Sequence, residues 1–222
     1  MRAVLLALLA LLVAAPAAAD LPDPSAAPPL PGNLSGRIEA RRPGTTCGAA
    51  LIASDLVVTA GHCLGPRARR VLRPADGGAP VAVVAAHRHP DWDRLRGTPR
   101  GWAVDLSLGV LADPLPAHRL DVRPIGPPPV VGEVLILETW LRPAPEPNRR
   151  DCPVVRLWRG LAVLGCPLVS GHSGAPVFRR TPDGPELVAI AVARMGQGPA
   201  TTGLAAPLAP MRDVLRAAAG RR

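Results

Sequence analysis

Three residues, well separated along the chain, carry the side chains that an activated serine needs to hydrolyse a peptide bond. They occur in the order His62, Asp105 and Ser173. A serine hydroxyl becomes a good nucleophile when a histidine accepts its proton, and a carboxylate that accepts the other ring proton fixes the tautomer of that histidine. Each residue type is common, so the prediction depends on whether the sequence around each one suits its role.

The segment around His62 suits a rigidly held general base. Residues 59–63 read Thr-Ala-Gly-His-Cys and directly follow the apolar run 56–58. A general base has to be held within hydrogen-bond reach of the nucleophile. The end of a strand would give that support, and a disulfide from Cys63 to Cys47 would clamp the turn. A lone histidine is more often an ordinary surface or core residue, so this segment is not sufficient by itself.

Ser173 lies in a segment of small residues between two apolar runs. Residues 170–176 read Ser-Gly-His-Ser-Gly-Ala-Pro. Glycines beside a serine let the backbone approach a substrate closely and adopt strained turn conformations. In such a turn the amide N–H groups of Gly171 and Ser173 could form an oxyanion hole, converging on the negative charge that develops during acyl transfer. The alternative for this segment alone is an ordinary Gly/Ser hairpin turn.

Asp105 is an acid within a largely apolar run. Residues 102–108 read Trp-Ala-Val-Asp-Leu-Ser-Leu, and a carboxylate in such a run needs a partner. If Asp105 faces His62, it can accept the Nδ1 proton and stabilise the imidazolium. The alternative is an acid that caps a turn at a strand end. Asp91 and Asp93 are weaker candidates for this role. The conjunction of three complementary residues carries the prediction of a Ser-His-Asp hydrolase.

Short strands are the elements that must position these residues. From about residue 36 to residue 207, apolar or alternating runs are separated by Pro, Gly and Asp turns, a pattern typical of an all-β sandwich or barrel. One helix is predicted at 211–219, opened by Pro210, and the run 124–129 is the candidate linker between two β halves. The predicted strands are 48–52, 56–59, 70–73, 81–86, 106–111, 131–140, 154–158, 161–165, 175–179, 187–193 and 202–205.

The beginning of the chain predicts export. Residues 1–19 contain Arg2, a Leu/Ala-rich run and a small-residue end, which together indicate a signal peptide cleaved after Ala19. The apolar run is too short to span a membrane. Residues 20–36 are rich in Pro and are expected to form an extended spacer or a pro-segment.

Cysteine count and charge restrict the other function classes. Four cysteines in an exported chain indicate two disulfides rather than a metal site, and no Cys-x-x-Cys cluster of the kind that zinc prefers is present. The net charge of +9 raises nucleic acid or anionic lipid as partners. The arginines occur singly or in pairs without a basic helix or an aromatic stacking platform, so we expect no nucleic-acid partner. An Arg-rich surface binder of nucleic acid or lipid is kept as a weaker hypothesis.

Over residues 47–210 the sequence resembles the chymotrypsin-like (trypsin-like) serine peptidases, particularly their shorter bacterial exported members. Residues 59–63 are similar to the family motif Thr-Ala-Ala-His-Cys, with Gly61 in place of the second Ala. Residues 89–90 and 104–108 are similar to its His-Pro and Asp-Ile-Ala-Leu-Leu patterns, and residues 171–176 to Gly-Asp-Ser-Gly-Gly-Pro with two changes. The order of the three candidate residues is also that of the family.

The resemblance implies an all-β fold of two six-stranded antiparallel β-barrels with a C-terminal helix, and no metal or organic cofactor. The first barrel is then expected at 37–123, with His62 and Asp105, and the second at 124–222, with Ser173. The implied activity is that of a secreted or periplasmic serine endopeptidase, a monomer that cuts protein or peptide substrates through an acyl-enzyme. The alternative is a catalytically silent homologue that acts as a binding or scaffold protein.

Three departures from the family pattern matter. His172 replaces the acid that, in many relatives, pairs with a new N-terminal amine after zymogen cleavage, so that switch is expected to be absent. Whether His172 lowers activity is left open. The usual Ile-Val-Gly-Gly start is missing, so a trimmed first barrel is one alternative. Cys152 and Cys166 do not obviously match the common family cystines, and we expect them to bridge the two arms of a hairpin.

The resemblance also gives an expected substrate pocket without an acid to bind Arg or Lys. A pocket lined only by uncharged residues would favour small or apolar side chains of the substrate. By similarity its base is Pro167, followed by Leu168, and its walls are Ala191, Val192, Ala193 and Gly203.

Overall fold

The computed structural model describes residues 30, 34–40, 46–65, 70–75, 77–116, 118, 122–140, 147–196 and 201–219. The predicted signal peptide and all of the predicted spacer except Leu30 and residues 34–36 lie outside the described residues. Among the helices within these ranges, none has both the length and the apolar character required to cross a bilayer.

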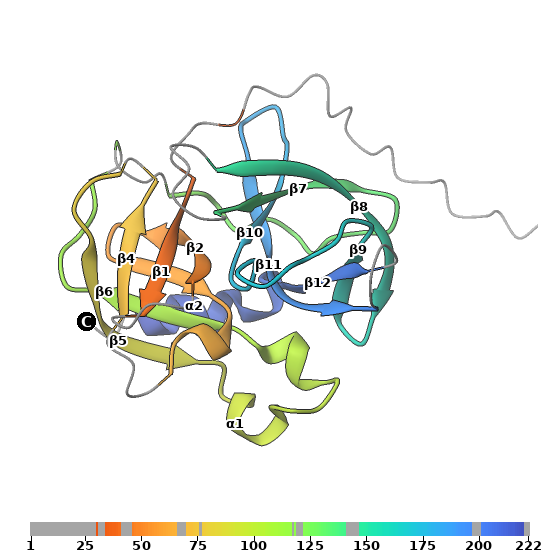
Figure 1. Ribbon diagram of the computed structural model, residues 1–222, viewed down its shortest axis with the longest axis horizontal. Helices are drawn as coiled ribbons and strands as arrows, with labels where there is room; N and C mark the ends of the chain where they lie inside the picture. Colours follow the sequence, from red (N-terminus) through yellow and green to blue (C-terminus); the bar gives the residue numbers. More distant parts are fainter. Residues whose placement is uncertain are drawn as a thin grey trace, which may run out of the picture.

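Two closed antiparallel barrels of six strands each lie side by side (Figure 1). Around the first barrel the strand order is β1-β2-β3-β6-β5-β4, and around the second it is β10-β11-β12-β9-β8-β7. The predicted fold class is therefore confirmed. The first barrel comprises β1 (Ser35–Ala40), β2 (Thr46–Ala53), β3 (Leu56–Thr59), β4 (Arg70–Pro74), β5 (Val81–Arg88) and β6 (Ser107–Leu111). The second comprises β7 (Val134–Thr139), β8 (Asn148–Trp158), β9 (Leu161–Leu164), β10 (Pro176–Arg179), β11 (Glu186–Met195) and β12 (Thr202–Pro207).

Each predicted strand corresponds to a strand of the structure, but β1 has no predicted counterpart. Its sequence, Ser-Gly-Arg-Ile-Glu-Ala, contains one large apolar residue, Ile38, which is 1% exposed. The strand exists because both of its edges are paired, with β2 on one side and β4 on the other. The pairing results from closure of the barrel, so the local hydrophobic pattern of the strand does not predict it. The missing family start therefore does not remove a strand from the first barrel.

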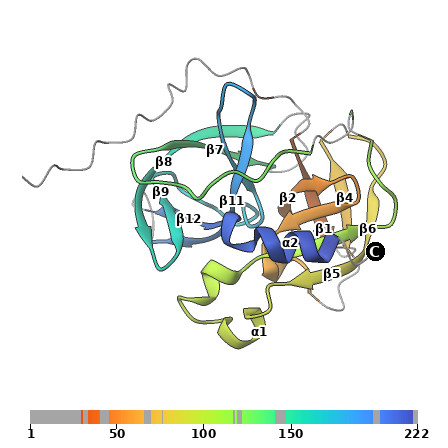
Figure 2. The same ribbon diagram turned by 180° about the vertical axis from the view of Figure 1, so that it is seen from behind.

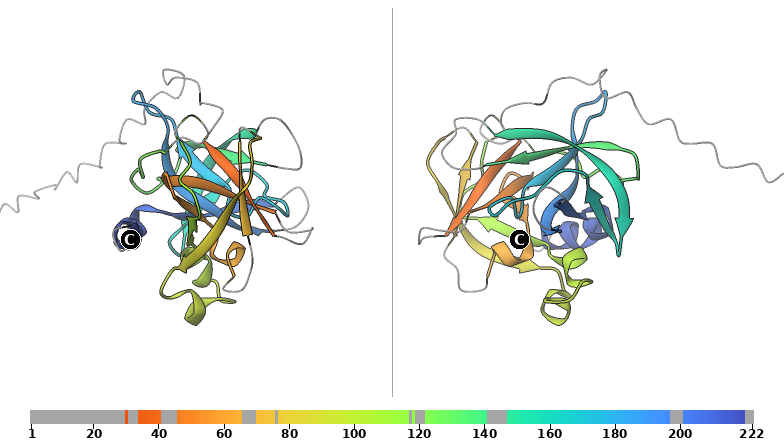
Figure 3. Two further views of the ribbon diagram at one scale, coloured as in Figure 1. Left: turned by 90° about the vertical axis from the view of Figure 1, so that its left-hand side faces the viewer. Right: turned by 45° about the vertical axis from the view of Figure 1, so that its right-hand side comes forward.

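Helical segments are few and short. The predicted C-terminal helix is confirmed as α2 (Arg212–Ala219), preceded by a 3₁₀ turn at Ala209–Met211. Figures 2 and 3 show α2 on the outer face of the two barrels. There the Arg212 guanidinium donates a hydrogen bond to the carbonyl of Ile125, at 2.7 Å. Two segments that were not predicted, α1 (Trp92–Leu95) and a 3₁₀ helix at Gly101–Val104, fill the connection from β5 to β6.

A buried polar cluster fastens the N-terminal strand to the second barrel. Glu138 on β7 is fully buried and accepts hydrogen bonds from the Ser35 hydroxyl and from Arg149 Nε, the latter at 2.8 Å. The Trp140 indole donates to the same serine hydroxyl at 2.9 Å, and Arg149 also donates to the carbonyl of Leu30 at 2.8 Å. Burial raises the pKa of Glu138, and the hydrogen bonds from Ser35 and Arg149 oppose that rise.

The barrels also meet where two glycines allow backbone to approach backbone. The N–H of Gly48 on β2 donates to the carbonyl of Ser173 at 2.8 Å, and a Cβ on Gly48 would lie 2.5 Å from Ala175 Cα. Gly174 has φ +79°, and a Cβ there would overlap the Thr59 hydroxyl and the Gly48 carbonyl. Because a side chain at either position would push the barrels apart, both positions require glycine.

We expect Gly174→Ala to destabilise the protein far more than Gly77→Ala. The two glycines have similar φ angles, +79° and +71°, so both substitutions pay the cost of a left-handed backbone, about 1 kcal/mol. A Cβ on Gly77 meets no atom within 4 Å, whereas at Gly174 overpacking should add about 1–3 kcal/mol. Urea unfolding measures both free energies. Equal losses would show that the contact between barrels tolerates a methyl group.

Candidate active site

His62 and Asp105 form a directly hydrogen-bonded pair. His62 Nδ1 lies 2.6 Å from Asp105 Oδ2, and the backbone N–H of His62 donates to Oδ1 at 2.9 Å. Asp105 is 2% exposed, whereas the His62 side chain is 41% exposed. The carboxylate therefore uses one oxygen to hold the His62 backbone and the other to hold the ring. The ring is turned so that Nδ1 faces the buried acid, which leaves Nε2 as the nitrogen available for proton transfer.

Local structure explains how the pair is positioned. His62 lies in a 3₁₀ turn, Gly61–Cys63, which directly follows β3 and Ala60. Asp105 follows the 3₁₀ helix Gly101–Val104 and lies two residues before β6, the neighbour of β3 in the sheet. A Cβ on Gly61 would lie only 3.0 Å from Asp105 Oδ1, so the glycine leaves the carboxylate room to approach.

A contact with the second barrel supports the segment that carries Asp105. The rings of Trp102 and Trp158 have centroids 5.9 Å apart, and the Ala103 methyl lies 3.6 Å from where a Cβ on Gly160 would be. Trp158 is the last residue of β8, and Gly160 lies in the turn between β8 and β9. The catalytic candidates of the first barrel are thus braced by the barrel that carries Ser173.

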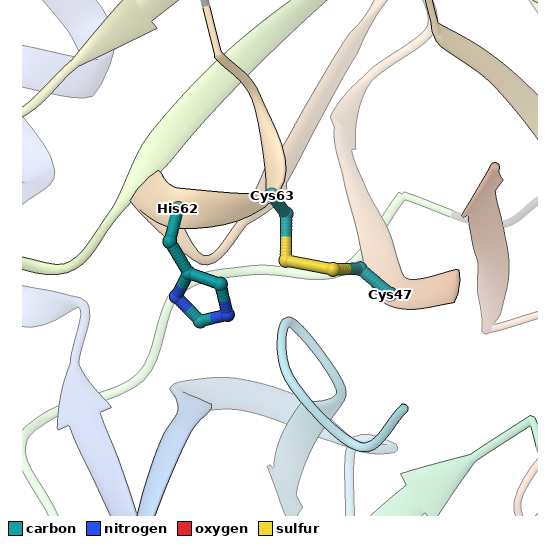
Figure 4. Close-up of side chains that lie close together, drawn as sticks. All are labelled: Cys47, His62 and Cys63. Carbon is teal, nitrogen blue, oxygen red and sulfur yellow. A yellow bond between two sulfur atoms is a disulfide. The ribbon is translucent and has the colours of Figure 1, made fainter. Parts of the chain in front are cut away.

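Both expected disulfides are present. Cys47–Cys63 ties the turn of His62 to β2, and Cys152–Cys166 joins the two arms of the β8–β9 hairpin. Figure 4 shows His62 and Cys63 leaving the same short turn, with the disulfide running to Cys47. Cys47, His62 and Cys63 are close enough to suggest a metal site. Because the disulfide occupies both sulfurs, that group offers one imidazole nitrogen and no thiolate ligand.

The turn that carries Ser173 presents two unused amide donors. Gly171 has φ +95° and Gly174 has φ +79°, both in the left-handed region that favours glycine. The N–H groups of His172, Gly174 and Ala175 donate to carbonyls of Val169, Ala191 and His172. Within the described residues the N–H groups of Gly171 and Ser173 have no acceptor. These are the two amides expected to form the oxyanion hole.

Ser173 is held next to the turn of His62. Its carbonyl accepts the hydrogen bond from Gly48, the residue after Cys47, and a Cβ on the following Gly174 would lie 3.3 Å from Ala60 N. Among the described residues the Ser173 hydroxyl has no hydrogen-bond partner, so the hydrogen bond from serine to histidine is not formed in this structure. In free enzymes such hydrogen bonds are often long and tighten when substrate binds.

His172 fastens the Ser173 turn from inside. It is 4% exposed, and its Nδ1 accepts a hydrogen bond from the backbone N–H of Val169 at 3.3 Å. Nε2 is buried and has no partner within the described residues. Since Nδ1 accepts, the ring is neutral and its proton sits on Nε2. Burial lowers the pKa of His172 below its ordinary value of 6.5, and the positive charge of Arg150 lowers it further.

A cavity of about 230 Å³ opens beside Ser173. Two expected pocket residues, Leu168 and Ala193, line it, and so do Val169, Ser170 and Arg194, which the sequence analysis did not assign to it. The other four expected residues do not line this cavity: Pro167 is exposed, and Ala191, Val192 and Gly203 are buried. Val169 and Ser170 could have been assigned to the cavity from the sequence, because they directly precede Gly171 in the segment that carries Ser173. Arg194 was not, because one arginine among many carries no local signal.

Residues 25–125 match a family model described as Trypsin. The matched range contains His62 and Asp105 and ends before Ser173, so the likeness of the second barrel rests on its fold. None of the curated proteins compared with the chain matches it.

The neutral His172 gives stability a specific pH dependence. Its folded-state pKa lies below that of the unfolded chain, so the unfolded state binds the proton more readily. The contribution to stability is complete above about pH 6.5 and is lost as pH falls through the folded-state pKa. We expect His172→Phe to lose part of this dependence between pH 7.5 and pH 5, measured by urea unfolding. His87→Phe, which changes an exposed histidine, should keep the wild-type slope. Matching slopes for all three proteins would contradict the assignment.

Proposed function

We propose that this chain, a member of the chymotrypsin-like family of serine peptidases, is an active endopeptidase that uses Ser173, His62 and Asp105. The observation that carries the proposal is the 2.6 Å contact between His62 Nδ1 and the buried carboxylate of Asp105, next to the turn of Ser173. A buried acid that holds a half-exposed histidine in one tautomer is the arrangement that makes a serine hydroxyl nucleophilic.

Peptide-bond cleavage would then proceed in two stages. The Ser173 oxygen attacks the scissile carbonyl carbon while its proton passes to His62 Nε2. The oxyanion accepts hydrogen bonds from the N–H groups of Gly171 and Ser173. His62 next gives its proton to the leaving amine, and the C–N bond breaks to leave an acyl-enzyme. Water then attacks the acyl carbon while His62 takes one of its protons. The ester C–O bond breaks, the peptide leaves with a new carboxyl group, and His62 returns the proton to the Ser173 oxygen.

Asp105 contributes by orientation and charge. Because Nδ1 donates to Asp105, Nε2 lacks a proton in the resting state and can accept the one from Ser173. The buried carboxylate also stabilises the imidazolium that forms when the proton arrives, and it does so more strongly than an exposed acid could.

Export completes the proposal. Both disulfides are of the kind that persists in oxidising compartments, in agreement with an enzyme that is secreted or held in a periplasm after removal of residues 1–19. Its substrates would be proteins or peptides, and we expect it to act as a monomer.

A silent homologue with a binding or scaffold role is the second candidate. Two observations favour it: the buried Nε2 of His172 has no partner within the described residues, and the Ser173 hydroxyl has none there either. An unpaired buried donor costs about 1–3 kcal/mol, and that cost would act on the turn that has to hold the oxyanion. Reactivity of the serine separates the two candidates.

A fluorophosphonate probe is expected to label the mature protein at Ser173. The probe reacts with serines that a neighbouring base activates, so Ser173→Ala should abolish labelling, while Ser54→Ala, in the exposed turn between β2 and β3, should leave labelling intact. Fluorescence in a denaturing gel measures both. A folded wild-type protein that takes up no probe would favour the silent homologue.

Asp105→Asn is expected to lower kcat by about 10³–10⁴-fold with little change in KM, because an amide in this position favours the wrong tautomer of His62. Asp91→Asn changes the weaker candidate acid, which pairs with Arg94 at the surface, and should retain wild-type kcat. Initial rates on a casein or peptide substrate provide the measurement. If Asp91→Asn were the inactivating change, the acid would be misassigned.

A further inference from the structure

We propose that the cavity beside Ser173 selects an acidic side chain, Glu or Asp, on the substrate residue whose carbonyl Ser173 attacks, and that Arg194 determines this preference. The proposal rests on the proposed function and names its substrate class. Geometry and charge support it through separate residues.

The shape of the cavity suits one short side chain. Its volume of about 230 Å³ lies below the range of roughly 300–1,000 Å³ typical of small-molecule pockets. Leu168 is buried, and its Cγ lies 2.9 Å from where a Cβ on Gly203 would be. The leucine side chain therefore occupies the space in front of Gly203 on β12. A long side chain would find the way toward β12 closed, and a short one would end near the cavity mouth.

Arg194 is the one charged residue among those that line the cavity, and no acid accompanies it. Its side chain is exposed, and within the described residues it forms neither an ion pair nor a hydrogen bond. The following residues 197–200, Gln-Gly-Pro-Ala, include no acid in their sequence. The guanidinium is thus available to a ligand, and Arg194 lines a cavity whose other lining residues are neutral.

A second cation contacts the residue that follows Arg194. Arg156 on β8 is exposed, and its guanidinium contacts the Met195 sulfur at 3.8 Å, next in the chain to Arg194. It has no carboxylate partner among the described residues. Two guanidinium groups near residues 194–195 make the local potential positive, which favours an anionic side chain and repels Lys or Arg.

The chemistry of arginine defines the ligand class. A guanidinium stays charged at all working pH values and offers paired N–H donors that match the two oxygens of a carboxylate. Glu and Asp side chains carry that group at the end of one or two methylenes, the reach that a shallow cavity allows. The sequence analysis predicted a preference for small or apolar substrate side chains because it did not place Arg194 in the lining of the cavity.

Matched substrates isolate the charge. Two fluorogenic peptides that differ only in Glu or Gln before the scissile bond have nearly equal volume, so their kcat/KM ratio reports recognition of the carboxylate. We expect the Glu peptide to be favoured at least tenfold by the wild-type protein, and the ratio to fall as salt concentration rises. A ratio near one, or an Ala or Leu peptide cleaved tenfold better than the Glu peptide, would overturn the proposal.

Variants of Arg194 assign the effect to its residue. Arg194→Gln should bring the Glu/Gln ratio close to one, and Arg194→Glu should invert it and improve cleavage after Lys. Arg73→Gln, which removes an arginine from β4 of the other barrel, should leave the ratio unchanged. Fluorophosphonate labelling of each variant shows that the serine is still reactive. An unchanged ratio in Arg194→Gln would exclude this arginine as the selecting group.

Failure of the proposed function gives a different result. If no peptide is cleaved and Ser173 takes up no probe, the endopeptidase assignment falls, and the cavity is then tested by binding alone. Product peptides that end in Glu or Gln are titrated against the Ser173→Ala protein by calorimetry. Tighter binding of the Glu peptide by tenfold or more supports the recognition site, and equal affinities or no binding of either peptide overturn it.

Discussion

The arrangement of the candidate site depends on a contact between the two barrels that is made by backbone atoms. Gly48 of the first barrel donates a hydrogen bond to the carbonyl of Ser173, and the next residue of that turn, Gly174, leaves no room for a Cβ against Thr59. Cys47 adjoins this contact and is bonded to Cys63, the neighbour of His62. Strand β2 therefore holds the segment of His62 through a disulfide and the segment of Ser173 through a hydrogen bond.

The carboxylate of Asp105 is held by hydrogen bonds from His62. A carboxylate as buried as Asp105 is costly unless both of its oxygens are paired. One oxygen accepts from the backbone of His62 and the other from its ring, so the residue it orients also satisfies it. The Trp102–Trp158 contact braces the segment from the second barrel. The contact between the two barrels therefore also helps to align Asp105 with His62.

The sequence predicted most strands because burial leaves a local pattern: β3 was predicted at Leu56–Thr59, the same bounds that the structure gives. Strand β1 escaped because barrel closure, and not its own hydrophobicity, stabilises it. For the candidate site, motif and order gave His62, Asp105 and Ser173, and the structure pairs the first two. Arg194 could not be found in this way because it belongs to no motif. Its place at the cavity follows from the pairing of β11 with β12.

The turn before Ser173 contains a buried neutral histidine, whereas the cavity beside it is lined by an exposed arginine. In many relatives an acid at the position of His172 requires a cationic partner, supplied by a cleaved N-terminus. Here a neutral imidazole accepts the Val169 N–H from within the same turn, so no incoming charge is needed to close it. The N-terminal strand is instead fastened to the second barrel through Ser35 and Glu138. The turn is closed without an ion pair, so in the endopeptidase proposed above the exposed Arg194 is the charge that a substrate would meet at the cavity.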